Sequence, residues 1–460
     1  MIQTNILEAA LETAMSTGAD YAEIFAEDTT SGYLRFIGDG VRDVLDRHSV
    51  GVGVRVFRGL QYAYISSSGL APESVMRAAK KAAAAIASGQ EDVQIRLTPS
   101  CHPDLHPALR PGSELPLSEK VKLARRAYTA ARAYSSEIGQ TSVDLLDYNR
   151  KILIATSDGL LTTDSQVRSR IKISAVATAG NENQVGYNGP GAMQGYEFFD
   201  AIDVEGAARD AARQAVTMLH AGYCPAGRMP VAIDNGFGGV IFHEACGHSL
   251  EAYAVSRGLS EFAGKLGQKV ASDKVTAIDD GTMPGRWGST NIDDEGTPTQ
   301  KRVLIENGVL KSYMVDKLSG WRMGLPSTGS SRRQDYTFAP VSRMSNTYIA
   351  AGNDSDEAII RSIGNGLYAK KLGGGSVNPV TGEFNFAVNE GYLIRGGEIA
   401  EPVRGASLIG KGSEVIRNID MVGKNLRLEE GVCGASSGSI PTDVGQPMIR
   451  VSEITVGGRE

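Results

Sequence analysis

The sequence predicts an α+β protein, in which an N-terminal α+β domain over residues 1–220 is followed by a β-rich C-terminal domain over residues 229–460. Helical and strand-like segments follow the same order twice before residue 220, which suggests an internal duplication. Beyond about residue 300 most segments are short, alternating and separated by Gly, Asn or Pro. Glycine makes up 55 of 460 residues, about 12% against an average near 7%, so we expect many turns and close backbone approaches.

The first unit opens with a predicted helix over residues 4–16, where apolar residues recur at helical spacing and Gly18 follows. Alternating polarity predicts strands at 21–27, 50–57 and 61–65. Pro72 and Glu73 then begin an Ala-rich helix that reaches about residue 88. Five prolines between residues 99 and 116 exclude a helix or a central strand, so we expect a linker or a surface strap there.

The second unit repeats this order. A helix is predicted over residues 118–135, with Ser118 as its N-cap. Strand-like segments follow at 142–147, 151–156, 168–178 and 183–188. A second Ala-rich helix ends near Leu219.

The pattern changes from residue 229. A short strand at 229–234 leads into a helical segment flanked by glycines. The predicted strands beyond it are 302–305, 309–315, 384–388, 390–394 and 447–456.

Composition excludes several functional classes. The chain has 47 Lys and Arg against 53 Asp and Glu, a net charge of −6, which argues against direct nucleic-acid binding. Four scattered cysteines do not form a disulfide framework. No apolar run approaches the roughly 18 residues that span a bilayer, and the N-terminal segment carries Glu8 and Glu12 rather than the basic start of a signal peptide. We therefore expect a soluble, cytoplasmic protein with no membrane contact.

The most informative motif is His243-Glu244-Ala245-Cys246-Gly247-His248. Two histidines beside a glutamate suggest a zinc site with a general base next to it, although the usual zincin histidines are four residues apart. Five residues advance about 500° on an α-helix, which leaves these histidines roughly 140° apart. A shared metal therefore requires a π-bulge or a helix that ends before His248, and Gly247 permits both. The alternative is a pair of unrelated histidines.

A zinc site needs a third ligand besides the two histidines. Cys433 is a candidate because it lies between Gly431 and Gly434, which allow the backbone to approach closely. Cys246 is a second candidate inside the motif itself. The alternative for either cysteine is a small buried thiol.

These motifs resemble the TldD/PmbA family of zinc-dependent peptidases, and specifically its TldD-type catalytic member. The resemblance covers most of the chain and is densest from 229 to 450. Besides the histidine motif and the Gly-x-Cys-Gly sequence, it rests on the stretches 294–299 (DEGTPT), 306–313 (ENGVLKSY), 340–347 (PVSRMSNT), 377–384 (VNPVTGEF) and 402–406 (PVRGA).

The resemblance implies zinc held by His243, His248 and Cys433, with Glu244 as the catalytic base. It also implies a two-subunit assembly, either a homodimer or a heterodimer with a PmbA/TldE-like paralogue, that encloses the active site and admits unfolded or short polypeptides. Arg343 and Asn346 are candidate helpers, that is, donors that would assist zinc in polarising the scissile carbonyl. The alternative for both is a purely structural pairing.

Two other functions remain open at this stage. The family has also been described as a modulator of DNA gyrase, a noncatalytic binding role that needs no zinc and is compatible with contact to a protein. A thiol hydrolase with Cys433 as nucleophile and His243 or His248 as base is the third hypothesis.

Overall fold

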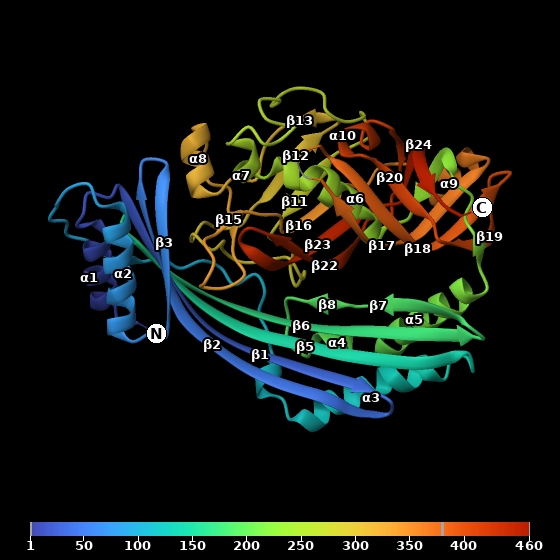
Figure 1. Ribbon diagram of the computed structural model, residues 1–460, viewed down its shortest axis with the longest axis horizontal. Coiled ribbons are helices and arrows are strands. Elements are labelled where there is room, and N and C mark those ends of the chain that lie inside the picture. The colour runs from blue at the N-terminus through green and yellow to red at the C-terminus, as the bar shows by residue number, and fades with distance from the viewer. Residues whose placement is uncertain (1, 379–380, 460) are drawn as a thin grey trace.

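The N-terminal part forms a long curved sheet, and the β-rich C-terminal part lies over the concave face of this sheet (Figure 1). The computed structural model describes residues 2–378 and 381–459. Pro379 and Val380, which belong to one stretch of the family resemblance, lie outside the described residues. The eight-stranded sheet has the order β3-β2-β1-β5-β6-β4, and β7 and β8 also pair with β6. Its strands are β1 (Tyr21–Ile37), β2 (Gly40–Arg58), β3 (Gln61–Ser68), β4 (Thr98–Pro99), β5 (Ile138–Thr156), β6 (Leu160–Ala179), β7 (Glu182–Asn188) and β8 (Gly191–Ala192).

The predicted α+β class is confirmed, and the predicted repetition of element order is present in the structure. One helix precedes and one follows each set of strands: α1 (Thr4–Met15) and α2 (Pro72–Ile86) flank β1–β3, and α3 (Leu117–Arg132) and α5 (Val204–Leu219) flank β5–β8. The two sets meet where β1 pairs with β5 in antiparallel register. Each helix pair buries its apolar side against the sheet, α1 and α2 at one end and α3 and α5 along the other part.

Several strands are longer than the sequence pattern predicts. Residues 28–49, outside the predicted strands, complete β1 and β2 as one hairpin, with Gly38 and Asp39 at positive φ in a two-residue turn. Leu34 and Phe36 of this hairpin are buried in the core, whereas residues 41–48 are exposed and are held by cross-strand pairing. Likewise, 142–147 and 151–156 join in β5. The expected cap at Ser118 is wrong, because α3 begins at Leu117 after Pro116.

Five strands of the C-terminal part close into a ring. They are β10 (Gly227–Ile233), β17 (Gly366–Val377), β18 (Glu383–Arg395), β20 (Ser407–Lys411) and β24 (Ile449–Gly457). The ring closes because β17 pairs with both β10 and β18, while β24 and β20 complete the path between them. Three further strands extend this sheet: β9 (Gly222–Tyr223), β19 (Glu398–Arg404) and β21 (Ile419–Val422).

A second C-terminal sheet carries the strand that contains Cys433. Its order is β13-β12-β11-β16-β23-β22, so β22 lies at its edge. The strands are β11 (Ala277–Asp280), β12 (Lys301–Glu306), β13 (Val309–Leu310), β16 (Asn346–Ile349), β22 (Arg427–Ala435) and β23 (Gly438–Gln446). The strand expected at 309–315 therefore ends at Leu310. Figure 1 shows the β22–β23 hairpin facing the long N-terminal sheet.

Short elements complete the chain. The pair β14 (Ser331–Arg332) and β15 (Val341–Ser342) forms a separate two-stranded sheet. The remaining helices are α4 (Phe198–Ala201), α6 (Val240–Phe242), α7 (Ala252–Val255), α8 (Lys317–Met323), α9 (Asp356–Ile363) and α10 (Gly412–Val415). Among the helices described, none has both the length and the apolar character that a membrane crossing requires.

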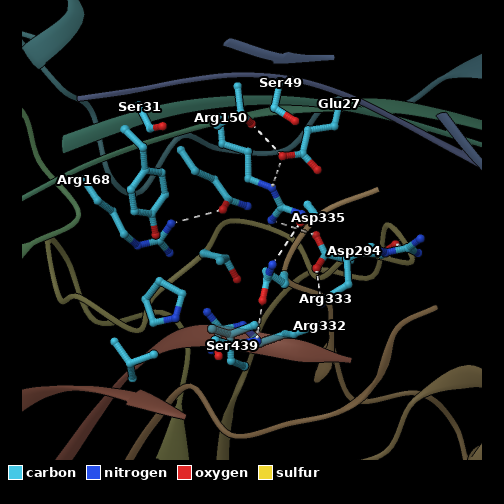
Figure 2. A pocket seen from close by; sticks show the side chains of 18 of the residues that line it. Glu27, Ser31, Ser49, Arg150, Arg168, Asp294, Arg332, Arg333, Asp335 and Ser439 are labelled. Atoms are coloured by element: carbon cyan, nitrogen blue, oxygen red, sulfur yellow. Dashed lines mark hydrogen bonds and ion pairs between the residues drawn. The ribbon is translucent and has the colours of Figure 1, made fainter. Parts of the chain in front are cut away.

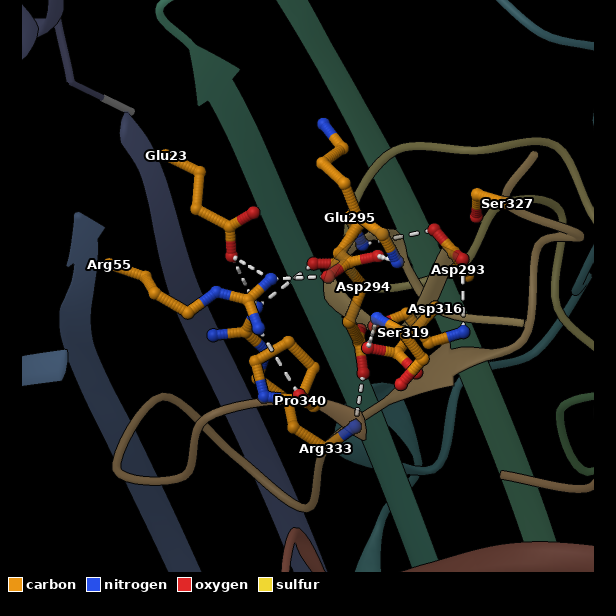
Figure 3. A network of polar contacts seen from close by, with 12 residues as sticks. Glu23, Arg55, Asp293, Asp294, Glu295, Asp316, Ser319, Ser327, Arg333 and Pro340 are labelled. Carbon is orange, nitrogen blue, oxygen red and sulfur yellow. Dashed lines mark hydrogen bonds and ion pairs between the residues drawn. The ribbon is translucent and has the colours of Figure 1, made fainter. Parts of the chain in front are cut away.

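Buried ion pairs join the N-terminal sheet to the C-terminal part (Figure 3). Arg55 of β2 pairs with Glu23 of β1 at 2.9 Å and also with Glu295, which belongs to the other part of the chain. Arg333, from the C-terminal part, also pairs with the N-terminal sheet, since its guanidinium lies 3.4 Å from Glu23. Charges buried this deeply require such partners, so the network fixes how the two parts dock.

Candidate metal centre

The histidine motif lies on a helical segment whose winding changes within a few residues. A 3-10 turn at Gly236–Gly239 leads into α6, which continues as a π-helical turn over His243–Gly247. The backbone N–H of His248 donates to the carbonyl of His243, five residues earlier. Of the two local structures that the spacing allowed, the π-bulge is therefore the one present. It brings His243 and His248 to the same side of the segment.

Glycines let this segment pack directly on neighbouring backbone. A Cβ at Gly239 would lie 2.4 Å from the carbonyl oxygen of Gly445 in β23, and one at Gly412 would lie 2.2 Å from the carbonyl oxygen of Ala245. A Cβ at Gly247 would meet the Met344 sulfur at 2.3 Å. The π-turn is thus held on several sides by contacts that a larger residue would prevent.

The structure brings Cys433 to the two histidines. The Cys433 sulfur lies 3.3 Å from Nε2 of His243 and 3.2 Å from Nε2 of His248. One potential ligand atom from each of the three residues falls within 4.8 Å of the other two. Ligand atoms of a tetrahedral zinc site lie about 3.4–3.6 Å apart, given zinc–nitrogen and zinc–sulfur bonds of about 2.0–2.3 Å. The cluster therefore fits a metal site.

The electrostatics of the cluster favour a thiolate. Burial alone raises the pKa of the Cys433 thiol, but the adjacent His243 and His248 more than offset it, so the pKa lies well below its ordinary value. Burial lowers the pKa of His248, whereas Glu251 and Cys433 raise it, and the net pKa lies well above the usual range. A cation placed between these groups would displace protons from them, as metals do at thiolate and imidazole sites.

Glu251 contacts the cluster, and the sequence analysis missed it. Its Oε2 lies 3.1 Å from Nδ1 of His248, which leaves Nε2 of that ring facing Cys433. A carboxylate in this position fixes the tautomer and the orientation of a ligand histidine. The nearby Arg343 guanidinium lies 3.8 Å from the other oxygen of Glu251. The only available sequence signal was the three-residue spacing from His248.

Glu244 and Cys246 occupy different environments although they are two residues apart. The Glu244 carboxylate lies 3.6 Å from Nε2 of His248, and 29% of its side chain is exposed. It is therefore beside the cluster and open to solvent. Cys246 is fully buried among apolar side chains, and burial raises the pKa of its thiol well above the ordinary value. It is not among the three clustered residues.

The two candidate helper residues make structural contacts. Arg343 is completely buried and donates to the backbone carbonyl of Cys433 at 2.6 Å and to Ser437 at 2.9 Å. It thereby holds the strand that presents the thiol. Asn346 donates to the hydroxyl of Ser289 at 2.7 Å, and so it also serves the fold.

Comparison with known proteins identifies a family along almost the whole chain. Three family models match in order: PmbA/TldA metallopeptidase domain 1 at residues 22–86, the central domain at 110–219 and the C-terminal domain at 226–458. The metalloprotease TldD homolog of Haemophilus influenzae is 38% identical over 89% of this chain and 86% of its own length. Its counterpart in Buchnera aphidicola from Acyrthosiphon pisum is 34% identical over 98% of this chain and 95% of its own length.

More distant proteins share the fold. TldE from Thermococcus kodakarensis superposes with a TM-score of 0.78 over 99% of both chains at 20% identity. A Thermotoga maritima protein described as a candidate modulator of a DNA gyrase superposes with a TM-score of 0.81, over 98% of this chain and 99% of its own, also at 20% identity.

Proposed function

Because the chain belongs to the PmbA/TldD metallopeptidase family, we propose that it is a zinc-dependent peptidase, in which His243, His248 and Cys433 hold the metal and Glu244 is the general base. The observation that carries this proposal is the convergence of one thiolate-forming cysteine and two imidazoles beside a partly exposed glutamate. The name of a Saccharolobus solfataricus relative, zinc metalloprotease TldD homolog, supports the choice of metal; it is 28% identical over 71% of this chain and 68% of its own length.

Each residue has a chemical role in peptide hydrolysis. When bound, zinc supplies a Lewis acid that lowers the pKa of water and polarises a carbonyl. Two neutral imidazoles and one thiolate give the loaded site a net charge of +1, which preserves this Lewis acidity. Glu244 accepts a proton from the attacking water and transfers it to the leaving amine. Glu251 keeps His248 in the tautomer that directs Nε2 to the metal.

We further propose that the substrates are unfolded or short polypeptides and that the active site is enclosed by a two-subunit assembly in the cytoplasm. The partner is a second copy or a TldE-like paralogue, and the TldE structure with the same fold supports such a pairing. An enclosed site that binds peptide backbone would spare stably folded proteins, because their strands already satisfy their own hydrogen bonds.

A chelation experiment tests the proposal against its two alternatives. We expect the purified protein to hydrolyse an unfolded polypeptide, to lose this activity with its metal, and to regain it when one zinc per chain is restored. A noncatalytic binding protein would show no hydrolysis in any state. A Cys433 thiol hydrolase would keep its activity after metal removal and lose it on alkylation.

A further inference from the structure

A cavity of about 350 Å³ separates the N-terminal sheet from the β22–β23 hairpin (Figure 2). Ser31, Ser49 and Glu27 border it on the sheet side, and Arg332 and Ser439 lie on the opposite side. Apolar and aromatic side chains also contribute to its wall: Leu146, Tyr148, Trp287, Val432, Ile440 and Pro441. The cavity thus combines apolar walls with charged groups, and it is large enough for an amino-acid side chain or a chain terminus.

Two buried arginines at this cavity have no acidic partner. Arg332 is 6% exposed and Arg168 is 1% exposed. Arg332 donates from Nη1 to the backbone carbonyl of Met344 at 2.7 Å. Arg168 donates to the carbonyls of Trp287 and Ser289 and to the side-chain oxygen of Gln166. Within the described part of the chain, no carboxylate lies within 4.0 Å of either guanidinium.

The acidic residues that line the same cavity are already engaged. Glu27 pairs with Arg150 at 3.5 Å, and Asp294 pairs with the same arginine at 3.2 Å. Asp293 accepts backbone N–H groups of its own loop and of Ser331. Asp335 accepts from Thr337. Among the described residues, none of these carboxylates lies within ion-pair distance of Arg168 or Arg332, so neither guanidinium has a carboxylate in direct contact.

A buried guanidinium that has no carboxylate in direct contact is stabilised when an anion binds to it. Burial and repulsion from Arg168 lower the pKa of Arg332 to about 10, although Asp294 raises it in part, in agreement with a guanidinium that has no carboxylate in contact. The planar guanidinium of arginine matches a carboxylate through two parallel hydrogen bonds, and only Nη1 of Arg332 has a hydrogen-bond partner among the described residues.

The cavity adjoins the metal cluster across one edge strand. Val432, which lines the cavity, directly precedes Cys433 on β22, so the two side chains point to opposite faces of the hairpin. Val432 is 60% exposed, and β22 is the edge of its sheet in the described structure. An extended peptide of about four residues spans roughly 13 Å, enough to pass this edge from one face to the other.

We propose that the cavity binds a carboxylate group of the peptide substrate and so directs acidic peptides, or peptide C-termini, to the metal cluster. This inference rests on the proposed peptidase function and specifies its substrate class. Arg332 and Arg168 supply the positive charge, and the apolar wall contacts the rest of the bound residue. The source of the carboxylate is either an Asp or Glu side chain or the terminal carboxylate, and the experiment separates the two.

The test measures equilibrium binding of three decapeptides that share one sequence and a neutral fluorophore. One has a Glu and a C-terminal amide, one has Gln and a free C-terminus, and one has Gln and the amide. Zinc-loaded protein with Glu244→Gln keeps the peptides intact during the measurement. We expect one of the two carboxylates to tighten binding at least about tenfold over the neutral peptide, as a charge-assisted pair does at a desolvated site.

Adding Arg332→Gln should remove this advantage while the Kd of the neutral peptide changes less than about twofold. Arg395→Gln, which removes the same charge from an exposed pair with Glu401, should leave the advantage intact. Equal binding of all three peptides, or an advantage that survives Arg332→Gln, would overturn the proposal.

A second pair of variants covers the case in which Arg332→Gln does not fold. Val432 is exposed at the cavity, so Val432→Glu should place a competing carboxylate there and abolish the advantage, whereas Val432→Gln should retain it. Loss with both or with neither contradicts the proposal. Hydrolysis of the neutral peptide by protein with native Glu244 is measured in parallel. Its absence would refute the peptidase function while binding still reports on the cavity.

Discussion

At the scale of single residues, the metal cluster depends on which side of the π-turn each side chain occupies. His243 and His248 meet the Cys433 sulfur at 3.3 and 3.2 Å, whereas Cys246 points into the apolar core. Both cysteines are buried, so burial does not distinguish them; the charge of their neighbours does. Two imidazoles surround Cys433, and they favour its thiolate, which is the form that binds metal.

Substitution of the two cysteines should therefore have opposite results. We expect Cys433→Ala to lose most of the bound zinc and all hydrolysis, because two histidines alone do not complete the site. Cys246→Ala should keep both and lose only the stability associated with a small cavity. Elemental analysis and a hydrolysis assay on both variants measure this. Metal lost with Cys246 and retained without Cys433 would contradict the assignment.

The family resemblance named the three residues that cluster in the structure, but the sequence did not indicate their surroundings. The glycines beside Cys433 were expected to allow close backbone approach, but a Cβ at Gly434 would meet its nearest atom at 3.9 Å and one at Gly431 at 3.5 Å. The tight contacts are instead at Gly239, Gly247 and Gly412. These involve segments far apart in the chain, and a local pattern contains no information about such partners.

At the scale of elements, the π-turn explains why a spacing of five residues works. The spacing limited the choice to a π-bulge or an early helix end, but the contacts that favour the bulge come from Met344, β23 and the first residue of α10, Gly412. Strand lengths, too, depend on contacts that a local sequence pattern does not reveal. Residues 28–49 extend β1 and β2: Leu34 and Phe36 belong to the core, whereas the exposed residues 41–48 are ordered by pairing with β1 and by the Gly38–Asp39 turn.

Gly412→Ala should disturb the π-turn specifically. Its Cβ would lie 2.2 Å from the carbonyl oxygen of Ala245, which cannot move without shifting the residues between His243 and His248. We expect the free energy of unfolding to fall by about 1–3 kcal/mol, as at other overpacked sites. We also expect weaker zinc binding, because the two histidines would move relative to each other. Gly434→Ala, next to Cys433 but with open space, is the control and should keep zinc affinity. Urea unfolding and zinc titration of both variants make the comparison; equal zinc affinities would contradict the role of Gly412.

At the scale of the whole molecule, buried charges hold the N-terminal sheet against the C-terminal part. Arg55 and Glu23 lie on β2 and β1, and Glu295 comes from a loop about 240 positions later in the chain. The sequence shows Glu295 within a family stretch but gives no sign of its partner. Fold class and element order were predictable from periodicity, whereas this docking was not. The division into domains at 1–220 and 229–460 stays a prediction.

Breaking this network should destabilise the molecule strongly. Arg55→Met leaves Glu23 and Glu295 as buried charges with fewer partners, and we expect about 3–5 kcal/mol lower unfolding free energy. The control is Arg35→Met, which removes an ion pair with Asp144 whose arginine is 44% exposed, and should cost less than about 1 kcal/mol. Denaturant unfolding monitored by circular dichroism measures both. Similar losses for the two variants would show that the buried network does not hold the parts together.

The central claim, that Glu244 acts as a base beside a zinc ion held by His243, His248 and Cys433, is tested most directly by Glu244→Gln. The measurement combines zinc content per chain with the rate of hydrolysis of an unfolded polypeptide. We predict zinc stoichiometry near that of the unsubstituted protein and a rate lower by about 10²–10⁴, the usual loss when general-base assistance is removed. Loss of zinc together with activity, or retention of full activity, would contradict this account.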